Sequence, residues 1–110
     1  MSSLTAQVRF AIHDGELRIR VPPELEPLDD FLESEIGADR AVLDIVEHHV
    51  RHDRQWEFAG DSCELVLDGD TVTITHDYTG TAVTLARRDL RDLLADLGAF
   101  LGGVRRREKS

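Results

Sequence analysis

Two histidines lie one helical turn apart near the middle of the chain. His48 and His52 are at i and i+4 of a segment with helical periodicity, and Asp44 extends the same column by another turn. Two imidazoles and a carboxylate on one helix face could bind Zn²⁺ and activate a water molecule for hydrolysis. The metalloprotease pattern places a glutamate directly after the first histidine, whereas this sequence has His49 there. We therefore expect a solvated helix end and keep metal binding as the alternative.

A cysteine and a histidine lie on two strands that are predicted to pair. Cys63 and His76 could form a nucleophile and base if both side chains reached solvent. Alternation turns both side chains inward, however, and a buried thiol is normally inert. The sequence also lacks a Gly-rich phosphate loop with its lysine. We therefore predict neither a catalytic residue nor a cofactor, and we expect a protein that is not an enzyme.

Acidic residues are concentrated between positions 24 and 35. Asp29, Asp30 and Glu33 fall on one face of a predicted helix, opposite its leucines. Acid–base catalysis by paired carboxylates would need burial to raise one pKa, and that face lacks apolar neighbours. A solvated acidic face is the simpler interpretation, and a docking surface for a basic protein is the functional one. Trp56 could anchor such a partner if it is exposed, or else seal the edge of the core.

The charge balance also favours a basic partner. Thirteen Lys and Arg against 22 Asp and Glu give a formal net charge of −9. The resulting field repels phosphate backbones and anionic membrane surfaces, and it speeds encounter with cationic proteins. A basic protein is therefore the expected partner, whereas neither nucleic acid nor a membrane is expected.

Length and composition fit one compact domain. A chain of 110 residues with 41% hydrophobic and 32% charged residues can bury one modest core. We predict a single domain over 1–104 and a basic, flexible tail over 105–110. With one cysteine the chain cannot form an internal disulfide, and the sequence has neither a signal peptide nor an apolar run of 18 residues. A cytoplasmic location is expected.

Periodicity predicts the elements of the first half. Residues 4–12 and 17–21 alternate between apolar and polar on either side of an Asp-Gly turn, which predicts an antiparallel hairpin. Two prolines stop the second strand, and leucines at helical spacing then predict a helix that ends at Gly37. A second helix over 38–52 begins at the N-cap Asp39. Its expected apolar stripe comprises Ala41, Val42, Ile45, Val46 and His49.

The second half predicts a hairpin and a closing helix. Residues 63–67 and 72–75 alternate around an Asp-Gly-Asp turn, and 81–85 adds a short strand. Leucines spaced from Leu90 onward predict an amphipathic helix that ends at Gly102 and Gly103. The predicted fold is α+β: an antiparallel sheet of four to five strands in the order ββααβββα, with the helices packed on one face.

The middle of the chain carries a Trp, an Ala-Gly pair and an L-x-x-D-G-x-x-V hairpin within DRQWEFAGDSCELVLDGDTVTI, residues 53–74. In this arrangement the chain resembles the YacL-like family of small bacterial proteins. The resemblance implies a compact, acidic, non-enzymatic domain, and some members are associated with immunity to contact-dependent toxins. The chain departs from the family between 76 and 88, so no binding residue can be carried over. The matching positions are Trp56, Ala59, Gly60, Leu65, Asp68, Gly69 and Val72.

We therefore predict a non-enzymatic domain that binds or neutralises a basic protein partner such as a toxin, in the manner of an immunity protein. One alternative is a small metal-binding protein or hydrolase, and another is a structural homodimer built on an exposed sheet face. The candidate partner-binding residues are Asp29, Asp30, Glu33 and Trp56. The candidate metal ligands of the alternative are Asp44, His48 and His52.

Overall fold

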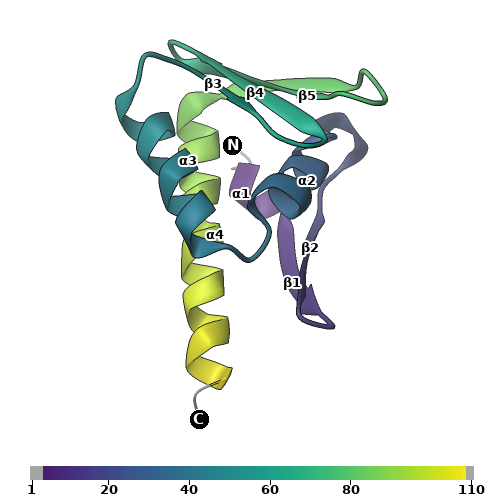
Figure 1. Ribbon diagram of the computed structural model, residues 1–110, viewed down its shortest axis with the longest axis vertical. Coiled ribbons are helices and arrows are strands. Elements are labelled where there is room, and N and C mark those ends of the chain that lie inside the picture. Colours follow the sequence, from purple (N-terminus) through teal and green to yellow (C-terminus); the bar gives the residue numbers. More distant parts are fainter. Residues whose placement is uncertain (1–3, 109–110) are drawn as a thin grey trace.

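The computed structural model describes residues 4–108 and shows an α+β fold with two antiparallel sheets (Figure 1). The α+β class is therefore confirmed. The helical elements are α1 (Leu4–Gln7), η1 (Pro23–Leu25), α2 (Leu28–Asp30), η2 (Phe31–Ile36), α3 (Arg40–His52) and α4 (Arg87–Glu108). The strands are β1 (Arg9–His13), β2 (Glu16–Arg20), β3 (Gln55–Ala59), β4 (Cys63–Asp68), β5 (Thr71–His76) and β6 (Ala82–Ala86).

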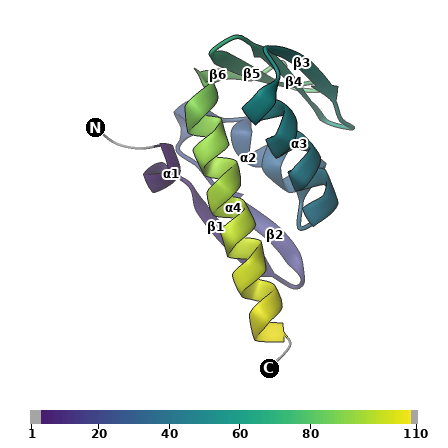
Figure 2. The same cartoon turned by 90° about the vertical axis from the view of Figure 1, so that its left-hand side faces the viewer.

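The larger sheet has four strands in the order β3-β4-β5-β6. Helices α3 and α4 and the α2–η2 segment lie on one face of this sheet, as Figures 1 and 2 show. The first hairpin, β1-β2, forms a separate sheet beside the helices. The prediction of a single sheet was therefore wrong, since the two hairpins pack on different sides of the helical layer.

The first hairpin is shorter than the predicted strands over 4–12 and 17–21. Asp14 and Gly15 both have positive φ, as a two-residue hairpin turn requires, and Arg9 pairs with Arg20 at its open end. In this register the two residues before Val8 would face Pro22 and Pro23, which have no N–H to donate. The strand therefore begins at Arg9, and the preceding residues form α1, which contacts α4.

The segment that contains Trp56 is a strand that was not predicted. Strand β3 pairs with β4, which places Trp56 opposite Leu67 and Phe58 opposite Leu65. Both aromatic side chains are half-buried and pack against the core. The alternation of Gln55–Ala59 was the signal for this strand, and its omission explains why the predicted order ββααβββα has one strand too few.

The core fills the space between the helices and the inner face of the larger sheet. Helix α3 contributes Leu43, Val46 and Val50, whereas Ile45, which was predicted to be in its apolar stripe, is 53% exposed. The predicted apolar stripe of α3 and its observed buried residues both have helical spacing, so periodicity alone could not show which of them faces the core. The core side chains of η2, β4, β5 and α4 include Phe31, Leu32, Leu65, Leu67, Val72, Ile74, Leu90, Leu93, Leu94 and Leu97.

Helix α4 is longer than predicted. It continues through Gly102 and Gly103 to Glu108, because neither glycine adopts the positive φ that ends a helix. The predicted tail over 105–110 is therefore helical as far as Glu108, and Lys109 and Ser110 lie outside the described residues. No helix in the described part of the chain is both long and apolar enough to cross a membrane.

The outer face of the larger sheet is uncovered in Figure 1. Its side chains alternate with those of the core and carry three carboxylates on β3 and β4 and threonines on β5 and β6. The exposed members of this face are Gln55, Glu57, Ala59, Glu64, Val66, Asp68, Thr71, Ala82 and Thr84.

Candidate functional site

A hollow of about 650 Å³ lies where the C-terminal end of α3, the start of α4 and the β4–β5 turn meet. We call it the arginine hollow, because four of its six lining residues are arginines. A single carboxylate lines it as well, so the local charge is positive in a chain whose net charge is −9. The lining residues are Arg51, Asp70, Ala86, Arg87, Arg88 and Arg91.

The arginines of the hollow differ in how their charges interact with the dipoles of the helices that carry them. Arg51 lies in the last turn of α3, where a cation interacts favourably with the negative end of the helix macrodipole. Arg87 and Arg88 are the first two residues of α4, and Arg91 follows one turn later. A cation in the first turn of a helix is unfavourable by roughly 0.3–1 kcal/mol, so Arg87 and Arg88 call for a compensating contact, whereas Arg91 lies beyond that turn.

Arg87 has that contact inside the fold. Its Nε donates a 2.7 Å hydrogen bond to the carbonyl of Val50, and its Nη1 donates to the carbonyl of Gly69 at 3.2 Å. Its backbone N–H donates to the carbonyl of Asp70 at 2.8 Å. Arg87 therefore ties the end of α3 to the β4–β5 turn and fixes the floor of the hollow.

The other three arginines lack strong partners. Arg88 makes no hydrogen bond or ion pair with any described residue. Arg91 lies 3.7 Å from its sequence neighbour Asp92, although adjacent residues do not face each other on a helix. Arg51 lies 3.8 Å from Glu47, and its side chain is half-exposed. Exposed ion pairs at such distances contribute little, so these guanidinium groups can bind an added anion.

The first turn of α4 adds free backbone donors. The residue before the helix is Ala86, whose methyl group cannot accept a hydrogen bond from the helix. Within residues 4–108, no side chain or carbonyl accepts from the N–H of Arg88 or Asp89. Backbone N–H groups at such an end attract anions.

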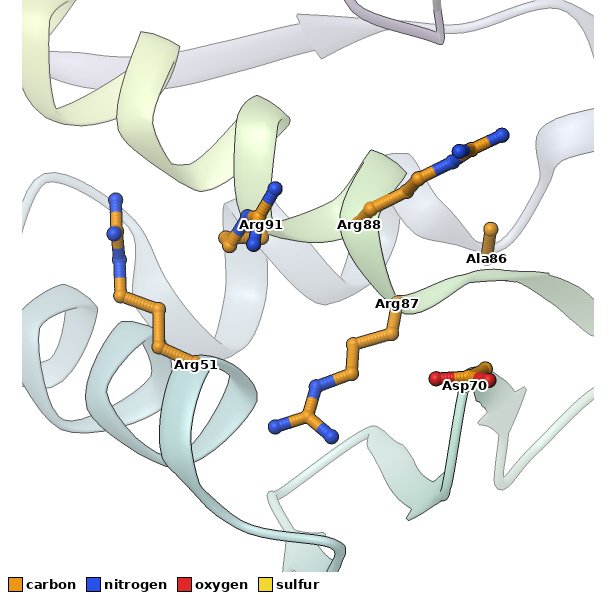
Figure 3. A pocket seen from close by; sticks show the side chains of 6 residues that line it. All are labelled: Arg51, Asp70, Ala86, Arg87, Arg88 and Arg91. Atoms are coloured by element: carbon orange, nitrogen blue, oxygen red, sulfur yellow. The ribbon is translucent and has the colours of Figure 1, made fainter.

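The guanidinium groups do not converge on one point. Figure 3 shows Arg51 extending from α3 on one side, Arg91 between the helices, and Arg88 directed away from Arg87. Asp70 lies on the turn beside Arg87. The arrangement distributes positive charge around the hollow and suits hydrogen bonding to several anionic oxygens.

The acidic segment over 28–36 is tied into the fold more closely than expected. Glu35 accepts hydrogen bonds from three backbone N–H groups, those of Asp61 at 3.0 Å, Ser62 at 3.1 Å and Cys63 at 2.9 Å. Glu33 accepts from the N–H of Ile19 at 2.9 Å. These two carboxylates therefore hold the first hairpin and the β3–β4 turn, and the expected solvated face is only partly present.

The remaining acidic candidates differ in exposure. Asp30 is exposed and lies 3.8 Å from the imidazole of His76. Asp29 has one buried carboxylate oxygen, which has no hydrogen-bond partner among the described residues. Glu33 retains a side-chain exposure of 24% and lies 3.6 Å from Arg18. Of the three acidic residues among the predicted partner-binding residues, only Asp30 has a mostly exposed side chain.

Trp56 packs the junction between α3 and the larger sheet. Its ring stacks on the imidazole of His49 with centroids 4.4 Å apart and an angle of 14° between the planes. The same imidazole lies 2.7 Å from a carboxylate oxygen of Asp53. Trp56 is half-buried, so the prediction that it seals the edge of the core describes it better than that of an exposed anchor.

The candidate metal ligands do not come together. The rings of His48 and His52 are adjacent, with centroids 4.8 Å apart. Asp44 instead accepts a 3.1 Å hydrogen bond from Arg40. Among residues 4–108, no three His, Cys, Asp or Glu side chains are grouped so that they could hold one ion. The metal-dependent alternative therefore lacks its third ligand in the described part of the chain.

Cys63 and His76 lie opposite each other on β4 and β5, the two strands that were predicted to pair. The thiol is buried, and burial together with the carboxylate of Glu35 raises its pKa to about 12. The Nδ1 atom of His76 accepts from the backbone N–H groups of Tyr78 and Thr79, both at 3.3 Å. A thiol that stays protonated at neutral pH is a poor nucleophile, which agrees with the expected inert role.

Sequence reasoning missed the arginine hollow. None of its four arginines was predicted to be a site residue. The available signal was the pair Arg87-Arg88 at a helix start that follows a strand without a capping residue. Comparison with protein-family models, with curated proteins and with solved structures found no match. The resemblance to the YacL-like family therefore stays a prediction.

Proposed function

We propose that this protein is a non-enzymatic binding domain that recognises an anionic group in the arginine hollow. One observation carries the proposal: Arg88, in the unfavourable first turn of α4, has no partner within the described residues, and Arg91 beside it in the hollow has only a 3.7 Å ion pair with its neighbour Asp92. An arginine at a helix N-terminus is electrostatically unfavourable, and when no residue of the fold compensates for its charge, binding of an external anion is the simpler reason for its presence.

The chemistry of the lining supports an anion over other ligands. Guanidinium groups donate planar, paired hydrogen bonds that match carboxylate and phosphate oxygens. The free N–H groups at the start of α4 donate to the same kind of atom. The lining has four arginines and one carboxylate, which gives an anion local positive charge in a chain whose net charge is −9.

The test is a calorimetric titration with inorganic phosphate, pyrophosphate and succinate, each at low and high salt. We expect saturable binding of at least one anion to the wild type. The double variant Arg88→Gln/Arg91→Gln should lower that affinity by about tenfold or more, since hydrogen bonds to charged groups are lost. Binding should weaken at high salt.

The matched control removes two arginines from another place. Arg9 and Arg20 are exposed, face each other on the first hairpin and have no partner within the described residues. The variant Arg9→Gln/Arg20→Gln has the same change in net charge and should bind like the wild type. Equal losses in both double variants would indicate diffuse electrostatic attraction, and no binding of any anion to the wild type would refute the proposal.

A second candidate function is the predicted binding of a basic protein, such as a toxin. The observation that favours it is the row of exposed carboxylates on the outer face of β3 and β4. The carboxylates of Glu57, Glu64 and Asp68 make no hydrogen bond or ion pair with any described residue. This face therefore offers negative charge that no internal contact uses, beside the edge strand β3.

An oligolysine peptide tests this second function. The triple variant Glu57→Gln/Glu64→Gln/Asp68→Asn should bind the peptide more weakly than a control triple variant in which three other exposed carboxylates are neutralised. Suitable control positions are Glu24, Glu26 and Asp96. Equal binding by the two variants would count against this face, and a doubled mass without peptide would instead favour the homodimer.

A further inference from the structure

The distribution of charge in the arginine hollow indicates the kind of anion that it binds. We propose that the ligand is a compact molecule with two or more linked phosphoryl groups, such as pyrophosphate or a nucleoside diphosphate. This inference rests on the proposed function, because it specifies the ligand of the same hollow. Three features of the structure support it, namely the spread of the guanidinium groups, the size of the hollow and the acidic residues beside it.

The guanidinium groups are too dispersed for a single phosphate. Arg51 reaches the hollow from α3, whereas Arg88 and Arg91 reach it from α4 and point in different directions (Figure 3). A guanidinium recognises phosphate oxygens by two parallel hydrogen bonds, which one phosphate can satisfy for few arginines at a time. Two or more phosphoryl groups could place oxygens near Arg51, Arg88 and Arg91, whose ion pairs are weak or absent.

The size of the hollow agrees with a ligand larger than one phosphate. Small-molecule sites typically occupy roughly 300–1,000 Å³, and the hollow measures about 650 Å³. The guanidinium plane of Arg88, which has no partner within the described residues, could also stack on an aromatic base. A nucleoside diphosphate is therefore compatible with the hollow, as is free pyrophosphate.

Acidic residues limit the length of the ligand. Glu47 lies next to Arg51, and Asp92 lies next to Arg91. Asp89 is in the first turn of α4, one residue beyond Arg88. A nucleic-acid strand that filled the hollow would extend over these carboxylates and over a chain of net charge −9, which repels its backbone. A compact polyphosphate avoids that repulsion.

The experiment compares four ligands in one titration series at low salt: inorganic phosphate, pyrophosphate, ADP and an oligothymidylate. We expect pyrophosphate and ADP to bind about tenfold or more tightly than inorganic phosphate, because they engage more arginines at once. ADP binding that equals or exceeds pyrophosphate binding would identify the esterified form as the natural class. The affinity for one oligothymidylate strand should be lower than the affinity for one pyrophosphate molecule.

Single variants show whether the arginines act together. Arg51→Gln and Arg88→Gln lie on opposite sides of the hollow, and neither side chain bonds to the backbone, so both variants should fold. Each should weaken pyrophosphate binding by about fivefold and change phosphate binding less. Equal affinities for phosphate and pyrophosphate, or tightest binding of the oligothymidylate, would overturn this inference and leave the proposed function intact. No binding of any ligand would overturn both.

Discussion

Removal of the Glu35 carboxylate should destabilise the protein far more than removal of an exposed carboxylate. Glu35 lies in η2, and its two oxygens accept hydrogen bonds from three backbone N–H groups of the β3–β4 turn and the first residue of β4, 26 to 28 residues away in sequence. Gly60 lacks a Cβ, and a Cβ at that position would collide with this carboxylate. The carboxylate thus occupies the space beside the turn and serves as its shared acceptor.

The magnitude follows from the three hydrogen bonds. A hydrogen bond to a charged acceptor contributes about 1.5–3 kcal/mol when it is buried. The N–H of Asp61 belongs to an exposed residue and can be hydrated after the change, which leaves the N–H groups of Ser62 and Cys63 to account for most of the loss. We expect Glu35→Ala to lower the free energy of unfolding by about 3 kcal/mol and the melting temperature by roughly 10–20 °C.

The assay is urea unfolding followed by far-UV circular dichroism. The control is Glu24→Ala, since Glu24 is exposed and has no partner within residues 4–108. Surface changes of this kind usually alter the free energy of unfolding by less than about 0.5 kcal/mol. If Glu35→Ala and Glu24→Ala were equally stable, the carboxylate would not be the acceptor that holds the turn, and the reasoning would be refuted.

Three further predictions concern Cys63, Arg87 and Gly60. A disulfide reagent should modify Cys63 at neutral pH only as fast as the protein unfolds. The pKa of this thiol is about 12 in the fold and 9.0 ordinarily, so between these pH values the unfolded state binds fewer protons than the folded state. The free energy of unfolding should therefore fall as the pH rises from about 9 to 12 in the wild type but not in Cys63→Ala. Arg87→Lys should lower the free energy of unfolding by about 1–2 kcal/mol in denaturant titrations, because an ammonium lacks the fork that binds two carbonyls. Gly60→Ala should destabilise the wild type in the same titrations but cost much less in Glu35→Ala, and equal losses in the two backgrounds would contradict the predicted collision.

The sequence predicted local structure well where a turn has a specific chemical signal. Both hairpins form around Asp-Gly turns, and Asp39 caps α3 by accepting from the N–H groups of Ala41 and Val42. These features depend on residues within a few positions of one another. A single sequence therefore contains the information that sets them.

Features that depend on distant partners were missed. Whether two hairpins share a sheet is decided by how each packs on the helices, and the local pattern of either hairpin is the same in both cases. The face of α3 that is buried depends on the position of α4, so Ile45 was assigned to the core although it is exposed. Only the strand β3 had a local signal that was overlooked, the alternation around Trp56.

The sites show the same limit. The carboxylates of Glu33 and Glu35 turn inward because backbone N–H groups of β2 and of the β3–β4 turn lie beside them. No sequence pattern predicts that these distant segments lie close together. The arginine hollow forms because the end of α3 meets the start of α4 through Arg87. The unfavourable arginines at a helix start were visible in the sequence, whereas their proximity to Arg51 was not.

The most direct test of the anion-binding hollow is a titration of ¹⁵N-labelled protein with pyrophosphate, followed by ¹H–¹⁵N correlation spectra. We predict saturable shifts at the backbone N–H groups of Arg88 and Asp89, at the β4–β5 turn and at the last turn of α3, with one common dissociation constant. The first hairpin, which carries Arg9 and Arg20, should remain unchanged. Shifts that are scattered over the arginines of both regions, or that are confined to the hairpin, would contradict the account.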